Sequence, residues 1–181
     1  MFSDRYGLTE AVLSEWKTMT RRIVPNSIPI GNWKETATKA YYKVGDFVAI
    51  AQSYKNAGVS FLPEEDEEFG CHIFPAAQTS GWTNKMFVRA DLMPHQIYIK
   101  DVRLQRLQCI SEDDCHKEGI YAEYEDEYPI TPYSFIYTFP NAPQHYSSPR
   151  EAYAALIDCI SGKGTWDSNP FVFVYEFELV K

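Results

Sequence analysis

The residues best suited to chemistry near the N-terminus form one short run, Lys17–Arg22, with the sequence KTMTRR. The run combines a lysine, two hydroxyls and two guanidinium groups. A lysine that is desolvated in a pocket can lose its proton near neutral pH. It can then activate a hydroxyl, here that of Thr20, as a nucleophile. The run therefore predicts attack on an amide or acyl group. Alternatively, the same groups bind a phosphate or a base edge and no bond is broken.

Either chemistry gains from a carboxylate that holds the lysine or transfers a proton, and Glu118 is the candidate. Ser111 and the three acids after it are typical of a helix start, and Gly119 is typical of a helix end. Glu118 would then close a helix at the end where acids are disfavoured, and a residue that breaks a local rule is a functional candidate. The alternative is an exposed Glu118 with a penalty of a few tenths of a kcal/mol.

The candidate residues fall into two groups. The catalytic candidates are Lys17, Thr20 and Glu118. Trp166 is a candidate stacking wall, and the full set of candidate ligand-binding residues is Thr18, Arg21, Arg22, Trp166 and Asn169. We predict no metal and no cofactor at this site, since none of the four cysteines forms a CxxC pair with structural zinc spacing.

The elements around the run should place Lys17 at a junction. Leu8, Val12 and Trp16 are spaced four apart, which predicts a helix with one apolar face before Lys17. The β-branched residues after Lys17 favour a strand that Pro25 ends. Side chains at such a junction can converge on a ligand. The alternative interpretation is a solvated turn, because lysines and arginines are mostly exposed.

The remaining chain predicts a β-rich fold with a few helices. We expect strands at 47–51, 85–90, 96–107 and 171–180, with a β-bulge near 100–101 where the apolar alternation changes phase. A capping box with proline at its first helical position predicts a helix at 148–161. Residues 26–40 are typical of a loop, and the acidic run 64–68 of a solvated loop. Segments 54–84 and 121–147 are predicted insertions, the second rich in tyrosine.

Composition limits the function classes. The 181 residues suit one core with insertions, and the net charge of -8 argues against tight, non-specific binding to duplex nucleic acid. No run of about 20 apolar residues predicts a membrane span, and the N-terminus does not resemble a signal peptide. We therefore predict a cytoplasmic protein whose four cysteines are reduced and mostly buried, with no membrane partner.

The run Lys17–Arg22 after a short helix resembles the ASCH domain family, a branch of the PUA-like β-barrels. The family pattern is a helix that ends in a Gly-x-Lys-Thr-x-Thr-x-Arg type run, and Glu15 stands here in place of the glycine. The segment 111–119 resembles the short acidic helix of that family, with Glu118 at its pocket glutamate. The Trp-x-x-Asn-Pro turn at 166–170 is similar to phage and bacterial ASCH-like proteins.

The resemblance implies a fold and two functions. The implied fold is α+β, a small PUA-like β-barrel with peripheral helices, as a single domain over residues 1–181 with the two insertions. The family implies binding of RNA or of a nucleoside. Some similar proteins are metal-independent amidohydrolases that deacetylate N4-acetylcytidine, which would assign Lys17, Thr20 and Glu118 to catalysis. The third alternative is a non-catalytic scaffold for protein interaction.

Overall fold

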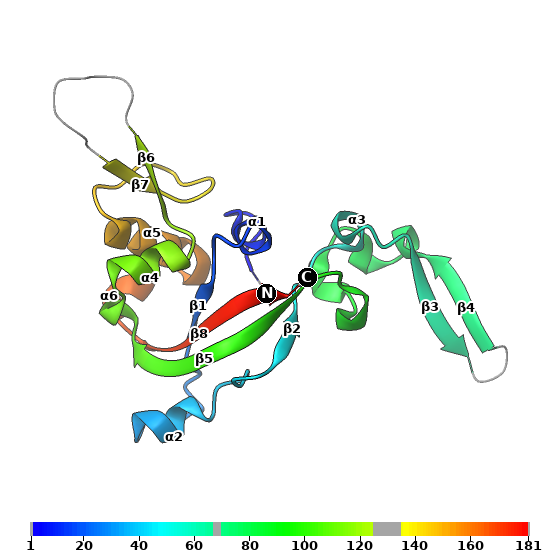
Figure 1. Ribbon diagram of the computed structural model, residues 1–181, viewed down its shortest axis with the longest axis horizontal. Coiled ribbons are helices and arrows are strands. Elements are labelled where there is room, and N and C mark those ends of the chain that lie inside the picture. Colours follow the sequence, from blue (N-terminus) through cyan, green and yellow to red (C-terminus); the bar gives the residue numbers. More distant parts are fainter. Residues whose placement is uncertain (1, 67–69, 125–134, 181) are drawn as a thin grey trace. The chain divides into compact units, whose positions relative to one another are not determined.

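The computed structural model describes residues 2–66, 70–124 and 135–180, and it divides the chain into two compact units. The first unit is formed mainly by residues 47–97, and the second by residues 3–46 and 98–179. The chain mixes helices with a curled antiparallel sheet (Figure 1). The predicted mixture of α and β structure is therefore confirmed at this level, while the single-domain organisation with insertions stays a prediction.

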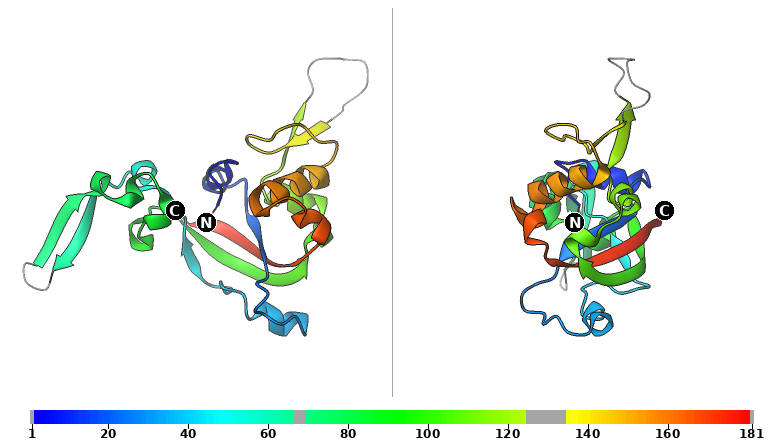
Figure 2. Two further views of the ribbon diagram at one scale, coloured as in Figure 1. Left: turned by 180° about the vertical axis from the view of Figure 1, so that it is seen from behind. Right: turned by 90° about the vertical axis from the view of Figure 1, so that its left-hand side faces the viewer.

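The second unit is built on three neighbouring strands in the order β1-β8-β5. Their bounds are β1 Met19–Ile23, β8 Phe171–Val180 and β5 Gln96–Arg106. Strand β1 runs antiparallel to β8, with Thr20 opposite Tyr175 and Arg21 opposite Val174. In β5 the buried positions change from Ile97 and Ile99 to Leu104, so the predicted change of phase is present. Figure 2 shows the bend of β5 and β8 from two further sides.

Helices lie on both sides of these strands (Figure 1). On one side lie α4 (Glu112–Lys117), α5 (Pro149–Ser161) and the single turn α6 (Thr165–Ser168), and on the other lies α2 (Trp33–Ala37). The predicted caps are confirmed, since Ser111 accepts a hydrogen bond from the Asp114 N–H and Ser148 accepts one from the Glu151 N–H. Strands β6 (Tyr121–Tyr124) and β7 (Phe135–Thr138) form a separate two-stranded antiparallel sheet.

The first unit has a small apolar core of its own. Its elements are β2 (Phe47–Ala49), α3 (Tyr54–Ala57), β3 (Phe61–Asp66), β4 (Gly70–Pro75) and four short 3-10 turns within 76–92. Tyr54, Leu62, Ala76 and Met93 form the core. A Cβ at Gly81 would lie 2.4 Å from the Tyr54 ring, so only glycine fits there.

Several predicted elements are wrong. Residues 33–37 are a helix inside the predicted loop 26–40, because Asn32 caps it by accepting a hydrogen bond from the Lys34 N–H. The predicted strand at 85–90 is instead a 3-10 turn, since Asn84 accepts a hydrogen bond from the Met86 N–H. Residues 64–66 of the acidic run belong to β3 and pair with β4, whereas 67–69 lie outside the described residues.

The helix α1 ends earlier than its apolar spacing predicts. It covers Leu8–Leu13, and the Trp16 and Glu15 N–H groups donate to the carbonyls of Ala11 and Val12. This is the Schellman arrangement, with Glu15 at the left-handed position (φ 62°) that usually takes glycine. Trp16 therefore leaves the helix axis and is 51% exposed, rather than continuing the apolar face of Leu8 and Val12.

Two further findings concern sequence expectations. No helix in the described ranges is long and apolar enough to cross a membrane. Cys109, Cys115 and Cys159 are free thiols, but only Cys115 is buried, so the expectation of mostly buried cysteines is wrong for the other two. Burial raises the pKa of Cys115 to about 12, which leaves it an unreactive thiol near neutral pH.

Candidate functional site

Lys17 and Glu118, which are far apart in the sequence, meet inside the second unit. The Lys17 Nζ donates to Glu118 Oε2 at 2.6 Å and to the Glu118 carbonyl oxygen at 2.8 Å. Both residues are buried, with 2% and 4% of their surface exposed. Burial of two charges is tolerated only when they are paired and hydrogen-bonded, and both conditions hold here.

The backbone at the two ends of this contact explains its position. After the turn at Glu15, the Lys17 N–H donates to the Ala11 carbonyl at 2.9 Å. The Thr18 N–H then donates to the carbonyl of Lys117, the last residue of α4, at 2.9 Å. Glu118 caps α4, and Gly119 follows with φ 102°. The end of α1 and the end of α4 are thus held together, and their side chains converge.

Arg21 extends the contact into a chain of ion pairs. Its guanidinium donates to Glu118 Oε1 at 3.0 Å and to Asp114 Oδ2 at 2.5 Å. Asp114 also accepts from Arg103 at 3.2 Å. With its side-chain amide in the opposite orientation, the Gln105 oxygen accepts hydrogen bonds from Arg21 Nη2 at 2.8 Å and from Arg21 Nε at 3.1 Å. Glu118 is therefore held between a lysine and an arginine, both buried.

Within the described residues, the chain of ion pairs, which we call the ion cluster, joins equal numbers of cations and carboxylates. Arg103 continues it towards Asp101 and Glu176, and Lys117 contacts Glu176 at 3.3 Å. The four cations are Lys17, Arg21, Arg103 and Lys117, and the four carboxylates are Asp101, Asp114, Glu118 and Glu176. Such a balanced cluster has little spare positive charge for a phosphate group.

Burial shifts the pKa values inside the ion cluster. It lowers the pKa of Lys17, although Glu118 acts in the opposite direction and favours the charged lysine. Burial also raises the pKa of Tyr153 well above its ordinary value, and the charge of Glu118 adds to that effect. Arg21 lies 6.0 Å from the centre of the Tyr153 ring, and the buried Tyr153 hydroxyl has no hydrogen-bond partner among the described residues.

The predicted nucleophile Thr20 lies on another side of β1. Side chains alternate along a strand, and Arg21 and Met19 share the face that contacts α4, so Thr20 belongs to the opposite face. No hydrogen bond joins Thr20 to Lys17 in the part of the chain that the structure describes. Arg22 lies opposite Phe173 and is exposed, and Thr18 contributes its backbone to the junction.

Trp166 and Asn169 belong to the turn that precedes β8. The Asn169 side chain accepts a hydrogen bond from the Gln108 N–H at 2.9 Å, and its φ of 44° is left-handed. The Trp166 ring packs edge-to-face on Tyr153 at 6.2 Å and under Arg150 at 5.2 Å. Trp166 contacts Tyr153, whose ring centre lies 6.0 Å from Arg21 of the ion cluster. Asn169 has a clear role in holding the turn.

Sequence reasoning missed an aromatic pair beside the ion cluster. The rings of Trp16 and Tyr121 stack at 4.9 Å with an angle of 21° between their planes. Trp16 directly precedes Lys17, and Tyr121 follows the segment Glu118–Ile120. The only available signal was the proximity of each ring to a candidate residue in sequence. Asp114 was also missed, because an acid in the first helical turn already has a capping explanation.

Two further searches, for a metal-binding group and for related proteins, identify nothing more at this site. Among residues 2–66, 70–124 and 135–180, no group of three or more His, Cys, Asp or Glu side chains could hold a metal ion. The ion cluster, its burial and its aromatic neighbours are therefore the observations on which a function has to rest. No family model, curated protein or solved structure matches this chain.

Proposed function

We propose that this protein is an ASCH-type, PUA-like protein that binds a small nucleobase-containing ligand next to the ion cluster. The observation that carries the proposal is the buried contact between Lys17 and Glu118 at 2.6 Å. These two residues are the lysine and glutamate that the resemblance to ASCH proteins assigns to one pocket. The two residues are 101 positions apart in the sequence, and their contact is expected if this chain shares the pocket of ASCH proteins.

The charge and the aromatics favour a nucleoside over an RNA strand. Binding of a long strand depends on cations that neutralise many phosphates, whereas the cations of the ion cluster are already paired with carboxylates. The net charge of -8 acts in the same direction. A base edge needs donors and acceptors rather than net charge, and the half-exposed Trp16 ring beside Lys17 offers a surface for stacking.

Isothermal titration calorimetry with cytidine, N4-acetylcytidine and a single-stranded oligonucleotide tests this proposal. We expect a nucleoside to bind, and we expect Lys17→Met to abolish binding while the protein stays folded. Lys117→Met is the matched control, because it removes a lysine of the same cluster whose side chain is 42% exposed. Binding of the oligonucleotide alone, or equal losses in both variants, would contradict the proposal.

A second candidate function is metal-independent deacetylation of an acylated nucleoside such as N4-acetylcytidine. The specific observation in its favour is the lowered pKa of Lys17 in direct contact with Glu118, since a neutral lysine can accept a proton. Thr20 would supply the hydroxyl that attacks the acyl carbon, forming an ester and releasing cytidine, and water would then release acetate. This reaction requires Thr20 to approach Lys17 when the substrate binds.

Chromatography of N4-acetylcytidine incubated with the purified protein tests the second function. We expect cytidine and acetate in equal amounts from the wild type, none from Thr20→Val, and partial recovery in Thr20→Ser, which keeps a hydroxyl. Full activity of Thr20→Val would exclude Thr20 as the nucleophile. Nucleoside binding without product in any variant would leave binding as the function and remove catalysis.

A further inference from the structure

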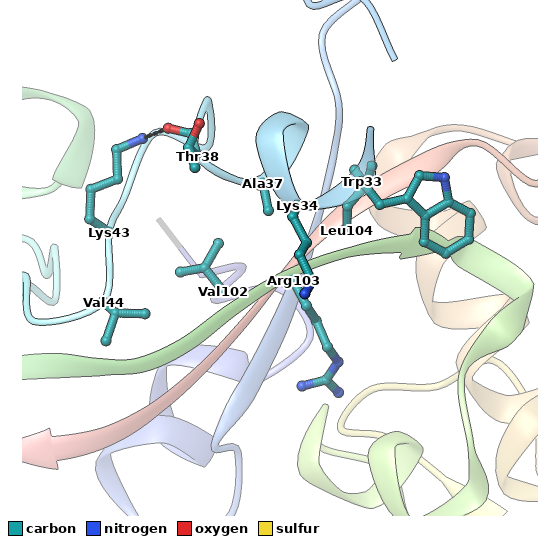
Figure 3. Close-up of a pocket in the computed structure, with 9 residues that line it drawn as sticks. All are labelled: Trp33, Lys34, Ala37, Thr38, Lys43, Val44, Val102, Arg103 and Leu104. Carbon is teal, nitrogen blue, oxygen red and sulfur yellow. Dashed lines mark hydrogen bonds between the residues drawn. The ribbon is translucent and has the colours of Figure 1, made fainter. Parts of the chain in front are cut away.

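A cavity of about 430 Å³ lies in the second unit between α2, the segment 38–44 and β5 (Figure 3). Its size falls within the range of small-molecule sites, about 300–1,000 Å³. Val102 and Leu104 of β5 form its floor, and Ala37 of α2 and Val44 contribute further apolar walls. The cavity therefore suits a ligand with an apolar body.

The cavity and the ion cluster share one residue, Arg103 of β5, but the Arg103 guanidinium belongs to the ion cluster. Alternation along a strand sends the side chains of Val102 and Leu104 to one face and that of Arg103 to the other. The Arg103 guanidinium contacts Asp101, Asp114 and Glu176, which belong to the ion cluster. Figure 3 shows this guanidinium beyond the β5 ribbon, away from α2. A ligand in the cavity would therefore not contact Lys17 or Glu118.

Two lysines give the cavity a positive charge. Lys34 extends from α2 towards β5, and its ammonium has no ion pair or hydrogen bond within the described ranges. Lys43 donates to the carbonyls of Thr38 and Ala40, so its charge is not neutralised by a carboxylate there. None of the nine lining residues is acidic. In a chain with a net charge of -8, a cavity lined in this way favours an anion.

Trp33 is the aromatic residue among those that line the cavity. It is 53% exposed and packs edge-to-face on Phe171 at 5.8 Å. That contact fixes the indole, and Trp33 is among the residues that line the cavity. Burying such a ring against another planar group is favourable, because aromatic pairs gain both burial and oriented contact.

We propose that this cavity binds a planar aromatic anion, with the ring system between Trp33 and the floor formed by Val102 and Leu104, and with the anionic group at the Lys34 ammonium. The proposal is independent of the function proposed for the ion cluster. A nucleoside monophosphate and an aromatic carboxylate share the required chemistry.

Calorimetric titration with 1-naphthyl phosphate tests the proposal, with 1-naphthol and inorganic phosphate as the two half-ligands. We expect the wild type to bind naphthyl phosphate at least about tenfold more tightly than either half, since both parts contact the protein. Lys34→Glu should weaken binding by at least about tenfold through charge reversal. Ala37→Phe, which fills the cavity without a change of charge, should abolish it. The matched control is Lys39→Glu, an exposed lysine of the same segment that does not line the cavity.

The variants separate a site from general charge attraction. Equal weakening in Lys39→Glu and Lys34→Glu, unchanged binding in Ala37→Phe, or no binding by the folded wild type would overturn the proposal. Displacement of naphthyl phosphate by cytidine monophosphate would support the proposal with a nucleotide as the ligand, and displacement by phenylpyruvate alone would support it with an aromatic acid. Lys17→Met should bind naphthyl phosphate like the wild type, whatever happens to nucleoside binding.

Discussion

The ion cluster and the cavity use opposite faces of the same strand but differ in how their charges are satisfied. In the ion cluster Lys17, Arg21 and Glu118 are buried and pair with one another. At the cavity Lys34 is exposed and has no partner among the residues described. A paired, buried charge contributes to the native state mainly by avoiding the penalty of being left alone, whereas an unpaired, exposed charge remains available to a ligand.

The difference separates effects on stability from effects on binding. Substitutions in the ion cluster should change the free energy of unfolding, because each removed partner leaves another charge without compensation. Substitutions at the cavity should leave that free energy nearly unchanged and alter ligand affinity instead. Stability measurements on both regions therefore sharpen the comparison before any ligand is identified.

The largest expected effect follows removal of the carboxylate at the centre of the ion cluster. Glu118→Ala leaves the buried Lys17 and Arg21 without their shared partner. We expect a loss of about 3–5 kcal/mol in the free energy of unfolding, measured by urea denaturation. The control is Glu178→Ala, because the pair of Glu178 with Lys100 is exposed and contributes less than about 1 kcal/mol. Similar small losses in both variants would mean that the ion cluster is solvated.

The next effect concerns the dependence of stability on pH. Burial lowers the pKa of Lys17 in the folded chain below its ordinary value of 10.5. The unfolded chain therefore binds more protons between these two pKa values, and stability should rise with pH across that interval. Lys17→Met should flatten this rise in denaturation measurements repeated from neutral to alkaline pH. An unchanged pH profile in the variant would assign the rise to other groups.

A smaller loss is expected at the turn before β8. Asn169→Ala removes the acceptor for the Gln108 N–H and places alanine at a left-handed φ of 44°. We expect a loss of about 2 kcal/mol by thermal or urea unfolding. Asn169→Asp keeps an oxygen acceptor and tolerates this conformation, so it should remain within about 0.5 kcal/mol of the wild type. Equal losses in the two variants would show that the hydrogen bond does not hold the turn.

The smallest effect is expected at the end of α1. Glu15→Gly places glycine at a left-handed position and should stabilise the protein by about 0.5 kcal/mol, since glycine lacks the steric penalty. Glu10→Gly, inside the same helix, should instead destabilise it by about 1 kcal/mol. Destabilisation by both substitutions would show that other contacts of Glu15 outweigh the backbone term.

Local rules predicted the elements that bring Lys17 and Glu118 together. The serine cap, the acidic first turn and Gly119 defined α4, and the β-branched residues before Pro25 defined β1. The apolar strand at 171–180 was likewise readable from its alternation, and β8 has these bounds. Each of these signals acts within a few residues of the chain, which is why sequence alone was sufficient.

Contacts between distant segments were beyond such rules. The pairing of Arg21 with Asp114 joins residues 93 positions apart, and nothing in either local sequence selects the other. Trp16 was assigned to a helical face because its spacing fits, but the left-handed Glu15 ends the helix first. The cavity combines α2, which capping by Asn32 creates within a predicted loop, with β5. Neither its shape nor its lysine without an ion pair among the described residues could therefore be predicted.

The most direct test of where a nucleoside binds is an NMR titration of the labelled protein with cytidine, which has no anionic group. We expect amide shift changes centred on Trp16–Arg22 and Lys117–Tyr121, on either side of the contact between Lys17 and Glu118. Changes confined to Trp33–Thr38 and Val102–Leu104 would place the nucleoside in the cavity instead, and no change at either region would contradict nucleoside binding by this protein.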